Sequence, residues 1–182
     1  MKLSFRAVDR DSWPDFAALF EARGGPKACW CMVWRASPAE ARQKDGASRR
    51  AQIKARVERG VPIGLIGYHD GTAVAWCSIA PRGSYRPLGG APADDETVWS
   101  LACFFVPRPH RGQGLTAQLI AAACDHARRG GATVLEAYPV EPQSPSYRFM
   151  GFVDAFAAAG FVEVGRAGSR RHVMRKRLMP KR

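Results

Sequence analysis

The chain has 182 residues, of which 46% are hydrophobic and 24% charged, the size and composition of one globular domain with a substantial core. Lys and Arg outnumber Asp and Glu by 28 to 16, and the resulting net charge of +12 favours polyanionic partners such as phosphorylated cofactors or nucleic acid. No apolar run approaches the ~20 residues that cross a bilayer, so we expect no membrane span.

The first third of the chain predicts one strand and two or three helices. Residues 3–7 alternate apolar and polar side chains, as a half-buried strand does. Ser12-x-x-Asp15 has the form of a capping box and predicts a helix that ends before residues 24–26 (Gly-Gly-Pro). Ser37-Pro38-Ala39-Glu40 predicts a second start, and a basic helix is expected over 48–60.

From residue 62 the pattern becomes rich in β-forming residues. Runs at 63–68 and 72–80 flank Asp70-Gly71 and predict a hairpin. Residues 81–96 form a long loop, and 98–106 is apolar on both faces, like a central strand. The remaining expected elements are a helix at 114–129, a strand at 134–140, a helix at 152–159 and strands at 161–164 and 172–178. We therefore predict a single mixed α/β (α+β) domain over residues 1–182.

The most informative segment joins the central strand to the following helix and reads Val106-Pro-Arg-Pro-His-Arg-Gly-Gln-Gly-Leu-Thr. Gly112 and Gly114 allow the backbone to approach a ligand without an intervening Cβ. The helix start directs unpaired N–H groups and a partial positive charge to the same point. Arg108 and Arg111 add full charges. This combination predicts a phosphate-binding loop, with an ordinary strand-to-helix turn as the alternative.

The same glycines also fit a dinucleotide fingerprint. Gly112-x-Gly114-x-x-Ala117, with Glu136 further on, matches that motif in spacing. The motif belongs to a doubly wound sheet of repeated βαβ units. Here the preceding strands are predicted to form an antiparallel meander, and no second βαβ half follows. A nicotinamide or flavin site is therefore the less favoured interpretation.

Residues 98–140 resemble the GNAT superfamily of N-acetyltransferases, whose loop reads Gln/Arg-x-x-Gly-x-Gly/Ala after the fourth strand. Ala158-Ala159-Gly160-Phe161 and residues 172–178 are similar to later landmarks of that superfamily. Residues 29–35 and 136–140 resemble a poorly characterised bacterial branch. The resemblance implies a mixed, mostly antiparallel central sheet flanked by helices, with acetyl-CoA as cosubstrate.

The resemblance also implies which residues hold coenzyme A. Backbone amides of one group cradle the pyrophosphate, and the end of the fourth strand pairs with the pantetheine. The first group is Arg111, Gly112, Gln113, Gly114, Leu115 and Thr116, and the second is Phe104, Phe105 and Val106. Pro109 replaces the family's Gln or Arg, so that contact is either missing or made by Arg108. Phe156 stands where many members carry the tyrosine that protonates the leaving thiolate.

These features predict acetyl transfer to a primary amine of a small molecule or peptide. An alkylammonium with a pKa of ~10.4 is almost fully protonated at neutral pH, so a base or a desolvating pocket must assist. Glu96, beside Asp94 and Asp95, is the candidate base, and Tyr138 and Tyr147 are the candidate acids. A solvated loop end for the carboxylate, and packing for either tyrosine, remain the alternative roles.

Other functions remain open at this stage. A longer acyl-CoA could replace acetyl-CoA, and a degenerate GNAT domain could bind coenzyme A or nucleic acid without turnover. The acceptor pocket is expected from the variable loops 26–36, 81–96 and 141–151. Neither basic zone, 35–60 nor the tail after Glu163, interleaves aromatics with its cations, so nucleic acid is not the partner we expect. A homodimer is compatible with these features.

The cysteines predict a reduced, cytoplasmic protein without a metal. Five residues, an odd number, lie mostly in apolar stretches, and no secretory segment follows Met1. Cys29-Trp30-Cys31 lacks the second Cys or His pair that a closed zinc site needs. Cys103 has no recognisable His partner, so we expect the amine to attack the thioester directly, without an acetyl-enzyme.

Overall fold

The computed structural model describes residues 1–90 and 97–179. Its strands are β1 (Ser4–Ala7), β2 (Leu65–His69), β3 (Thr72–Pro81), β4 (Val98–Phe105), β5 (Val134–Ala137), β6 (Val162–Ala167) and β7 (Arg171–Arg177). Within the described residues they form one seven-stranded sheet in the order β1-β2-β3-β4-β5-β7-β6. β4 and β5 are parallel, and every other neighbouring pair is antiparallel. The sheet is thus mixed and mostly antiparallel, as predicted.

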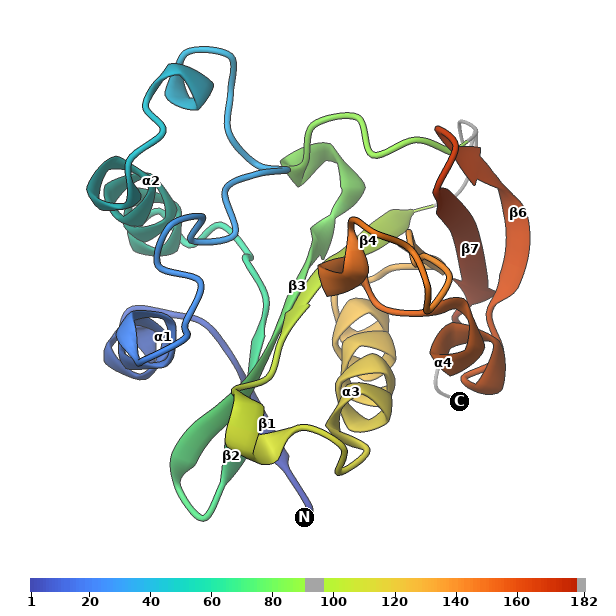
Figure 1. Cartoon of the computed structure of the whole chain (residues 1–182), viewed down its shortest axis with the longest axis horizontal. Helices are drawn as coiled ribbons and strands as arrows, with labels where there is room; N and C mark the ends of the chain where they lie inside the picture. The colour runs from blue at the N-terminus through green and yellow to red at the C-terminus, as the bar shows by residue number, and fades with distance from the viewer. Residues whose placement is uncertain (91–96, 180–182) are drawn as a thin grey trace.

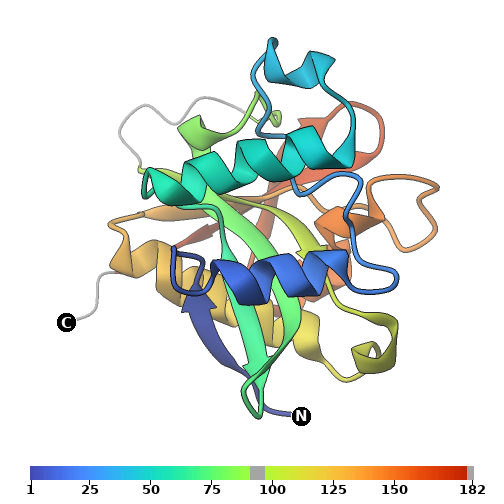
Figure 2. The same ribbon diagram turned by 90° about the vertical axis from the view of Figure 1, so that its left-hand side faces the viewer.

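Helices cover both faces of this sheet (Figures 1 and 2). One face carries α1 (Trp13–Glu21) and α2 (Gly46–Glu58), and the other carries α3 (Leu115–Arg129) and α4 (Val153–Ala158). The short 3₁₀ turns are η1 (Glu40–Arg42), η2 (Arg82–Ser84), η3 (Arg108–His110) and η4 (Arg148–Met150).

Each face has its own hydrophobic core. Leu101 of β4 packs beneath Leu119 of α3 on one face, in a cluster of fully buried aliphatic side chains. On the other face Phe16 of α1 meets Trp76 of β3, with ring centroids 4.7 Å apart. Burial of each such side chain stabilises the fold by roughly 1.5–3 kcal/mol, so the two helical layers fix the sheet from both sides.

Several predicted elements differ from the observed ones in length. The strand expected over 134–140 ends at Ala137, because Pro139 cannot donate to a ladder. The capping box at 37–40 forms, since Ser37 and Glu40 exchange hydrogen bonds of 2.8 and 3.2 Å, but only the 3₁₀ turn η1 follows it.

The capping box predicted at Ser12 is wrong. The Ser12 hydroxyl makes no helix-capping hydrogen bond, because it contacts Asp9 instead. It accepts from the Asp9 N–H at 3.0 Å and lies 2.9 Å from Asp9 Oδ1. Asp15, the expected partner, accepts a hydrogen bond from Tyr68. Helix α1 is present nonetheless, since its apolar face packs on β3.

Among the described residues, no helix has both the length and the hydropathy to cross a bilayer. In residues 1–90 and 97–179, no three His, Cys, Asp or Glu side chains converge as a metal site would require.

Candidate active site

The strands β4 and β5 separate halfway along β4. They pair only from Val98 to Leu101, opposite Val134 to Ala137. β4 continues to Phe105 and keeps its pairing with β3, with a bulge at Ala102. Beyond Leu101, the edge of β4 that faces away from β3 therefore has no strand partner among the described residues. Its peptide groups are free to bind a ligand that extends the sheet.

The loop that follows β4 ends in glycines with left-handed backbones. Gly112 has φ +74° and Gly114, the residue before α3, has φ +71°. A Cβ placed on either would meet no protein atom within 4 Å, so both face open space. The first-turn N–H groups of α3 have no intrahelical acceptors and point into the same space. Figure 1 shows this loop carrying the chain from the tip of β4 to the start of α3.

The residues predicted to bind coenzyme A lie in one continuous stretch. Phe104 and Phe105 end β4, and Arg108 is exposed in η3. The Arg111 side chain donates to the Val106 carbonyl at 2.8 Å and ties the loop to the strand end. The rest follow in the turn and the first turn of α3, namely Gly112, Gln113, Gly114, Leu115 and Thr116. Free N–H groups and cations thus meet at the unpaired end of β4.

A cavity of about 360 Å³ opens beside the β4 bulge. Its walls come from β3, from the end of β4 and from the three loops expected to form an acceptor pocket. The lining residues are Pro26, Cys29, Cys31, Val33, Trp34, Ser78, Tyr85, Ala102, Cys103, Phe104, Phe105 and Phe149. Most are apolar, and the polar side-chain groups are three thiols, two hydroxyls and the indole N–H of Trp34.

Two of these thiols interact with one another. The Trp76 indole N–H donates to Cys31 Sγ at 3.0 Å. The hydrogen bond with the Cys103 thiol, together with this indole and the charge of Arg35, lowers the pKa of Cys31 against the opposing effect of burial. The same thiol–thiol contact and burial raise the pKa of Cys103 well above its usual value. Cys103 therefore keeps its proton, and Cys31 is the more acidic of the two.

A buried arginine supports two hydroxyls of the cavity wall. Arg35 is only 4% exposed, and its Nη2 donates to Tyr85 at 2.7 Å and to Ser78 at 2.9 Å. Its guanidinium also lies 4.2 Å from the centre of the Tyr85 ring. Burial raises the pKa of Tyr85 to about 12, although the charge of Arg35 opposes the rise. The sequence alone predicted no role for Arg35 or Tyr85.

The predicted acids occupy different environments. Tyr138 is fully buried, and its hydroxyl donates to Glu136 at 2.5 Å and lies 2.8 Å from Ser100. Burial, together with the adjacent Glu136 charge, raises the pKa of Tyr138. Tyr147 is 36% exposed and has a left-handed backbone with φ +60°. Neither tyrosine lines the cavity, and Tyr147 lies nearer its rim, 6.4 Å from Trp34 between ring centroids.

Two further predicted features bear on catalysis. Glu96 lies outside the described residues, as do Asp94 and Asp95. Phe156, which replaces the family's tyrosine, is buried with its ring 6.0 Å from Phe104. A hydrocarbon ring at this position cannot donate a proton.

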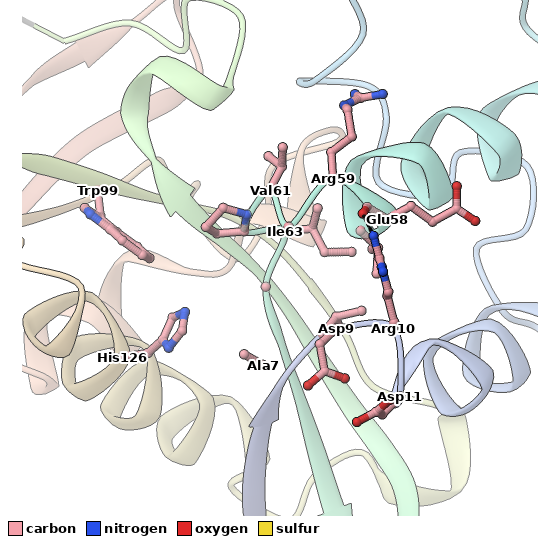
Figure 3. A pocket seen from close by; sticks show the side chains of 15 residues that line it. Ala7, Asp9, Arg10, Asp11, Glu58, Arg59, Val61, Ile63, Trp99 and His126 are labelled. Atoms are coloured by element: carbon pink, nitrogen blue, oxygen red, sulfur yellow. Dashed lines mark hydrogen bonds between the residues drawn. The ribbon is translucent and has the colours of Figure 1, made fainter.

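A larger cavity, of about 590 Å³, lies at the opposite end of the sheet (Figure 3). Trp99 at the start of β4 and His126 near the end of α3 form one wall, and Asp9, Asp11 and Glu58 lie across from them. Burial, followed by the charge of Arg129, lowers the pKa of His126. Neither the glycine loop nor the unpaired part of β4 lines this cavity, so we do not assign the active site to it.

Sequence comparison identifies the family. The model of the acetyltransferase (GNAT) family matches residues 26–152, which include β4, the glycine loop and α3. The chain belongs to the GNAT acetyltransferase family. This confirms the resemblance seen in the loop sequence. No curated protein matches the chain.

Solved structures of GNAT proteins share the fold over nearly the whole chain. One is yncA, an acetyltransferase from Salmonella typhimurium with acetyl-CoA (19% identity, 97% of this chain and 94% of that chain, TM-score 0.57). Another is the PaiA N-acetyltransferase from Thermoplasma acidophilum with coenzyme A (14%, 97% and 99%, TM-score 0.55). A third is a ribosomal-protein-alanine N-acetyltransferase from Brucella melitensis (20%, 97% and 100%, TM-score 0.58). At these identities the likeness concerns the fold alone.

Proposed function

We propose that this GNAT protein transfers an acetyl group from acetyl-CoA to a primary amine of a small molecule or peptide. The observation that carries the proposal is the continuity of the free β4 edge, the glycine loop and the start of α3. One stretch of main chain thereby offers peptide groups to an extended chain and N–H groups to a phosphate. Similar folds hold acetyl-CoA or coenzyme A, which supports the choice of donor.

In this proposal the main chain binds the donor. The N–H groups from Arg111 to Thr116 receive the pyrophosphate, and the side chain of Arg108 supplies charge nearby. The backbone of Phe104, Phe105 and Val106 holds the pantetheine in the manner of an added strand. The thioester then reaches the β4 bulge, where Ala102 and Cys103 form part of the cavity wall.

The amine attacks the thioester carbonyl directly from the cavity. The new C–N bond forms as the C–S bond breaks, the amine loses a proton, and the departing thiolate gains one. We propose Glu96 as the base, and Tyr138 and Tyr147 as the candidate acids. Tyr147 is the better placed of the two for proton delivery, because it is exposed. Tyr138 is buried, and its hydroxyl already donates to Glu136. Direct attack is supported by the raised pKa of Cys103, which keeps that thiol protonated and weakly nucleophilic.

Thermal unfolding and a thiol assay test the proposal together. Acetyl-CoA and coenzyme A should stabilise the protein, whereas NAD should not. With a panel of primary amines, released coenzyme A should equal acetylated amine mole for mole. Glu96→Gln should lower kcat at neutral pH if that carboxylate is the base. Absence of stabilisation by either form of coenzyme A would overturn the proposed function.

A binding protein without turnover is the second candidate, and Phe156 favours it. The usual proton donor is replaced by a ring that packs against Phe104. This candidate predicts stabilisation by coenzyme A but no release of coenzyme A with any amine. The assay above separates the two functions.

A further inference from the structure

Arg35 carries a buried charge that has no ionic partner in the described part of the chain. Its hydrogen-bond acceptors are neutral, namely the Pro62 and Ile63 carbonyls and the hydroxyls of Ser78 and Tyr85. Its Nε is buried and has no hydrogen-bond partner. Arginine is rarely this buried unless it is paired, because a desolvated charge is costly. Arg35 therefore lacks a counter-charge that a ligand could provide.

The two hydroxyls beside Arg35 connect this charge to the cavity. Both lie within hydrogen-bond distance of Arg35 Nη2, which shares its two protons among these hydroxyls and the Ile63 carbonyl, and the hydroxyls lie 3.0 Å from one another. One hydroxyl proton satisfies the contact between Ser78 and Tyr85. The second proton has no acceptor among the described residues, and both side chains line the cavity. A donor polarised by a buried guanidinium is thus available to a ligand.

The rest of the cavity wall does not suit a simple ammonium ion. Val33, Trp34 and Phe149 make it apolar, and none of the lining residues that the structure describes is Asp, Glu or His. Arg171 adds a second positive charge, 4.6 Å from the centre of the Trp34 ring. A thiol such as Cys31 is charged only when it ionises, so it supplies no fixed anion. Among the described residues that line the cavity, an alkylammonium without its own negative group would find no carboxylate as a counter-charge.

We propose that the acceptor is an amine that also bears a carboxylate on an apolar, aromatic-sized frame. Ser78 and Tyr85, supported by Arg35, bind the carboxylate, while the apolar wall holds the frame and the amine reaches the β4 bulge. The carboxylate is ionised at neutral pH, accepts a hydrogen bond from the hydroxyl whose proton is unused, and balances the charge of Arg35. A cavity of about 360 Å³ is within the size range of small-molecule sites. This inference rests on the proposed acetyl transfer, because it specifies the acceptor of that reaction.

Two pairs of amines that differ in the carboxylate test the inference. The first pair is phenylalanine and 2-phenylethylamine, and the second is 4-aminobenzoate and aniline. At least one carboxylated member should have a kcat/KM about 10-fold or more above its partner, the discrimination expected for hydrogen bonds to a charged group. Tyr85→Phe and Ser78→Ala should reduce that preference about 10-fold. The loss should fall mainly on the carboxylated member, and the fall in kcat/KM should be about 10-fold smaller for the partner without carboxylate.

Inhibition gives a readout that does not depend on turnover of the tested compound. 3-Phenylpropionate should compete with the amine about 10-fold more strongly than 3-phenylpropanol, and Tyr85→Phe should remove the difference. Stabilisation of each variant by acetyl-CoA confirms that it is folded.

The outcomes separate this inference from the proposed function. If the amines without carboxylate react as well as or better than their partners, the inference is overturned and acetyl transfer stands. An equal loss for both members of a pair in Tyr85→Phe would also overturn it, because Tyr85 would then act on the reacting atoms. If acetyl-CoA neither binds nor reacts with any amine, the proposed function itself fails.

Discussion

The two ends of β4 face cavities of opposite character. The larger one, at the start of the strand, is lined by charged side chains, and its carboxylates already have partners. Asp9 accepts from the Ser12 N–H at 2.8 Å and pairs with Arg6 at 3.1 Å, and the Arg10 guanidinium donates to the Glu58 carbonyl. At the other end, the edge of β4 is unpaired and the charge of Arg35 is not balanced by an anion among the described residues.

This difference shows that volume alone does not locate a binding site. The carboxylates of the cavity of about 590 Å³ already have ion-pair partners, whereas the one of about 360 Å³ lies beside buried N–H groups of Trp34 and Arg35 that have no hydrogen-bond partner among the described residues. Buried polar groups almost always have partners, so unmatched ones indicate where a ligand binds. Four experiments test this difference between the two cavities.

The largest effect is expected from the glycine loop. Acetyl-CoA at 100 times its Kd should stabilise the protein by about 2.7 kcal/mol, and Gly114→Val should abolish that gain. The added side chain would occupy the open space where N–H groups meet the ligand. Gly71→Val is the matched control, since Gly71 also has a left-handed φ, +76°, and open surroundings. Thermal unfolding with and without ligand measures both variants, and a retained gain in Gly114→Val would contradict the loop assignment.

A smaller effect is expected at the ion pair that supports the cavity wall. Arg56 donates to Glu40 at 2.7 Å and to the Arg35 carbonyl at 3.2 Å. The hydrogen bond from Arg56 lowers the pKa of Glu40 to about 2 against burial. Because the folded pKa lies below the unfolded value of about 4.3, this stabilisation is complete above pH ~4.3 and is lost as pH falls towards 2.

Glu40→Gln should therefore lower the free energy of unfolding by about 1–2 kcal/mol at pH 7. In denaturant titrations, the difference in the free energy of unfolding between this variant and the wild type should shrink as the pH falls from about 4.3 to about 3. Glu58→Gln is the control, since its surface pair with Lys54, at 3.6 Å, should contribute less than about 0.5 kcal/mol. A pH-independent difference would show that the charge of Glu40 is not the cause.

Substitution of a thiol that lines the cavity beside the β4 bulge should change the measured activity less still. Cys103→Ala should keep kcat within about threefold, because that thiol stays protonated and attack is direct. Labelled acetyl-CoA without acceptor should leave no stable label on the protein. A stable acetyl group on Cys31, the more acidic thiol, would instead indicate an acetyl-enzyme.

The smallest effect is expected in the larger cavity. Asp11→Asn and Arg59→Gln change charges on its wall (Figure 3) and should alter kcat/KM by less than about twofold. Steady-state kinetics with the preferred amine measures both variants. A loss of more than about tenfold would move the functional site to this end of the sheet.

Local patterns predicted the loop and the order of elements. The glycines, the strand before them and the helix after them are adjacent in sequence, so their geometry could be inferred directly. The signal for the hairpin was equally local, since Asp70 and Gly71 are adjacent and both adopt the left-handed backbone that such a turn requires. These elements place the proposed donor site.

The carboxylate site could not be found in the same way. Arg35 meets Ser78 and Tyr85 across 43 and 50 residues, so no spacing in the sequence relates them. The capping box expected at Ser12 does not form for a different, local reason, since the carboxylate of Asp9, a near neighbour in sequence, competes for the Ser12 hydroxyl.

The one-sided pairing of β4 also has a consequence for hydrogen exchange. Between Val98 and Leu101 both edges of the strand have partners, β3 and β5, so amides pointing either way are protected. From Ala102 to Phe105 one edge is open, and successive N–H groups of a strand point to opposite edges. Exchange in deuterated water should therefore alternate between slow and fast along this segment. A molecule seated on the open edge would erase the alternation and leave the upstream half of the strand unchanged.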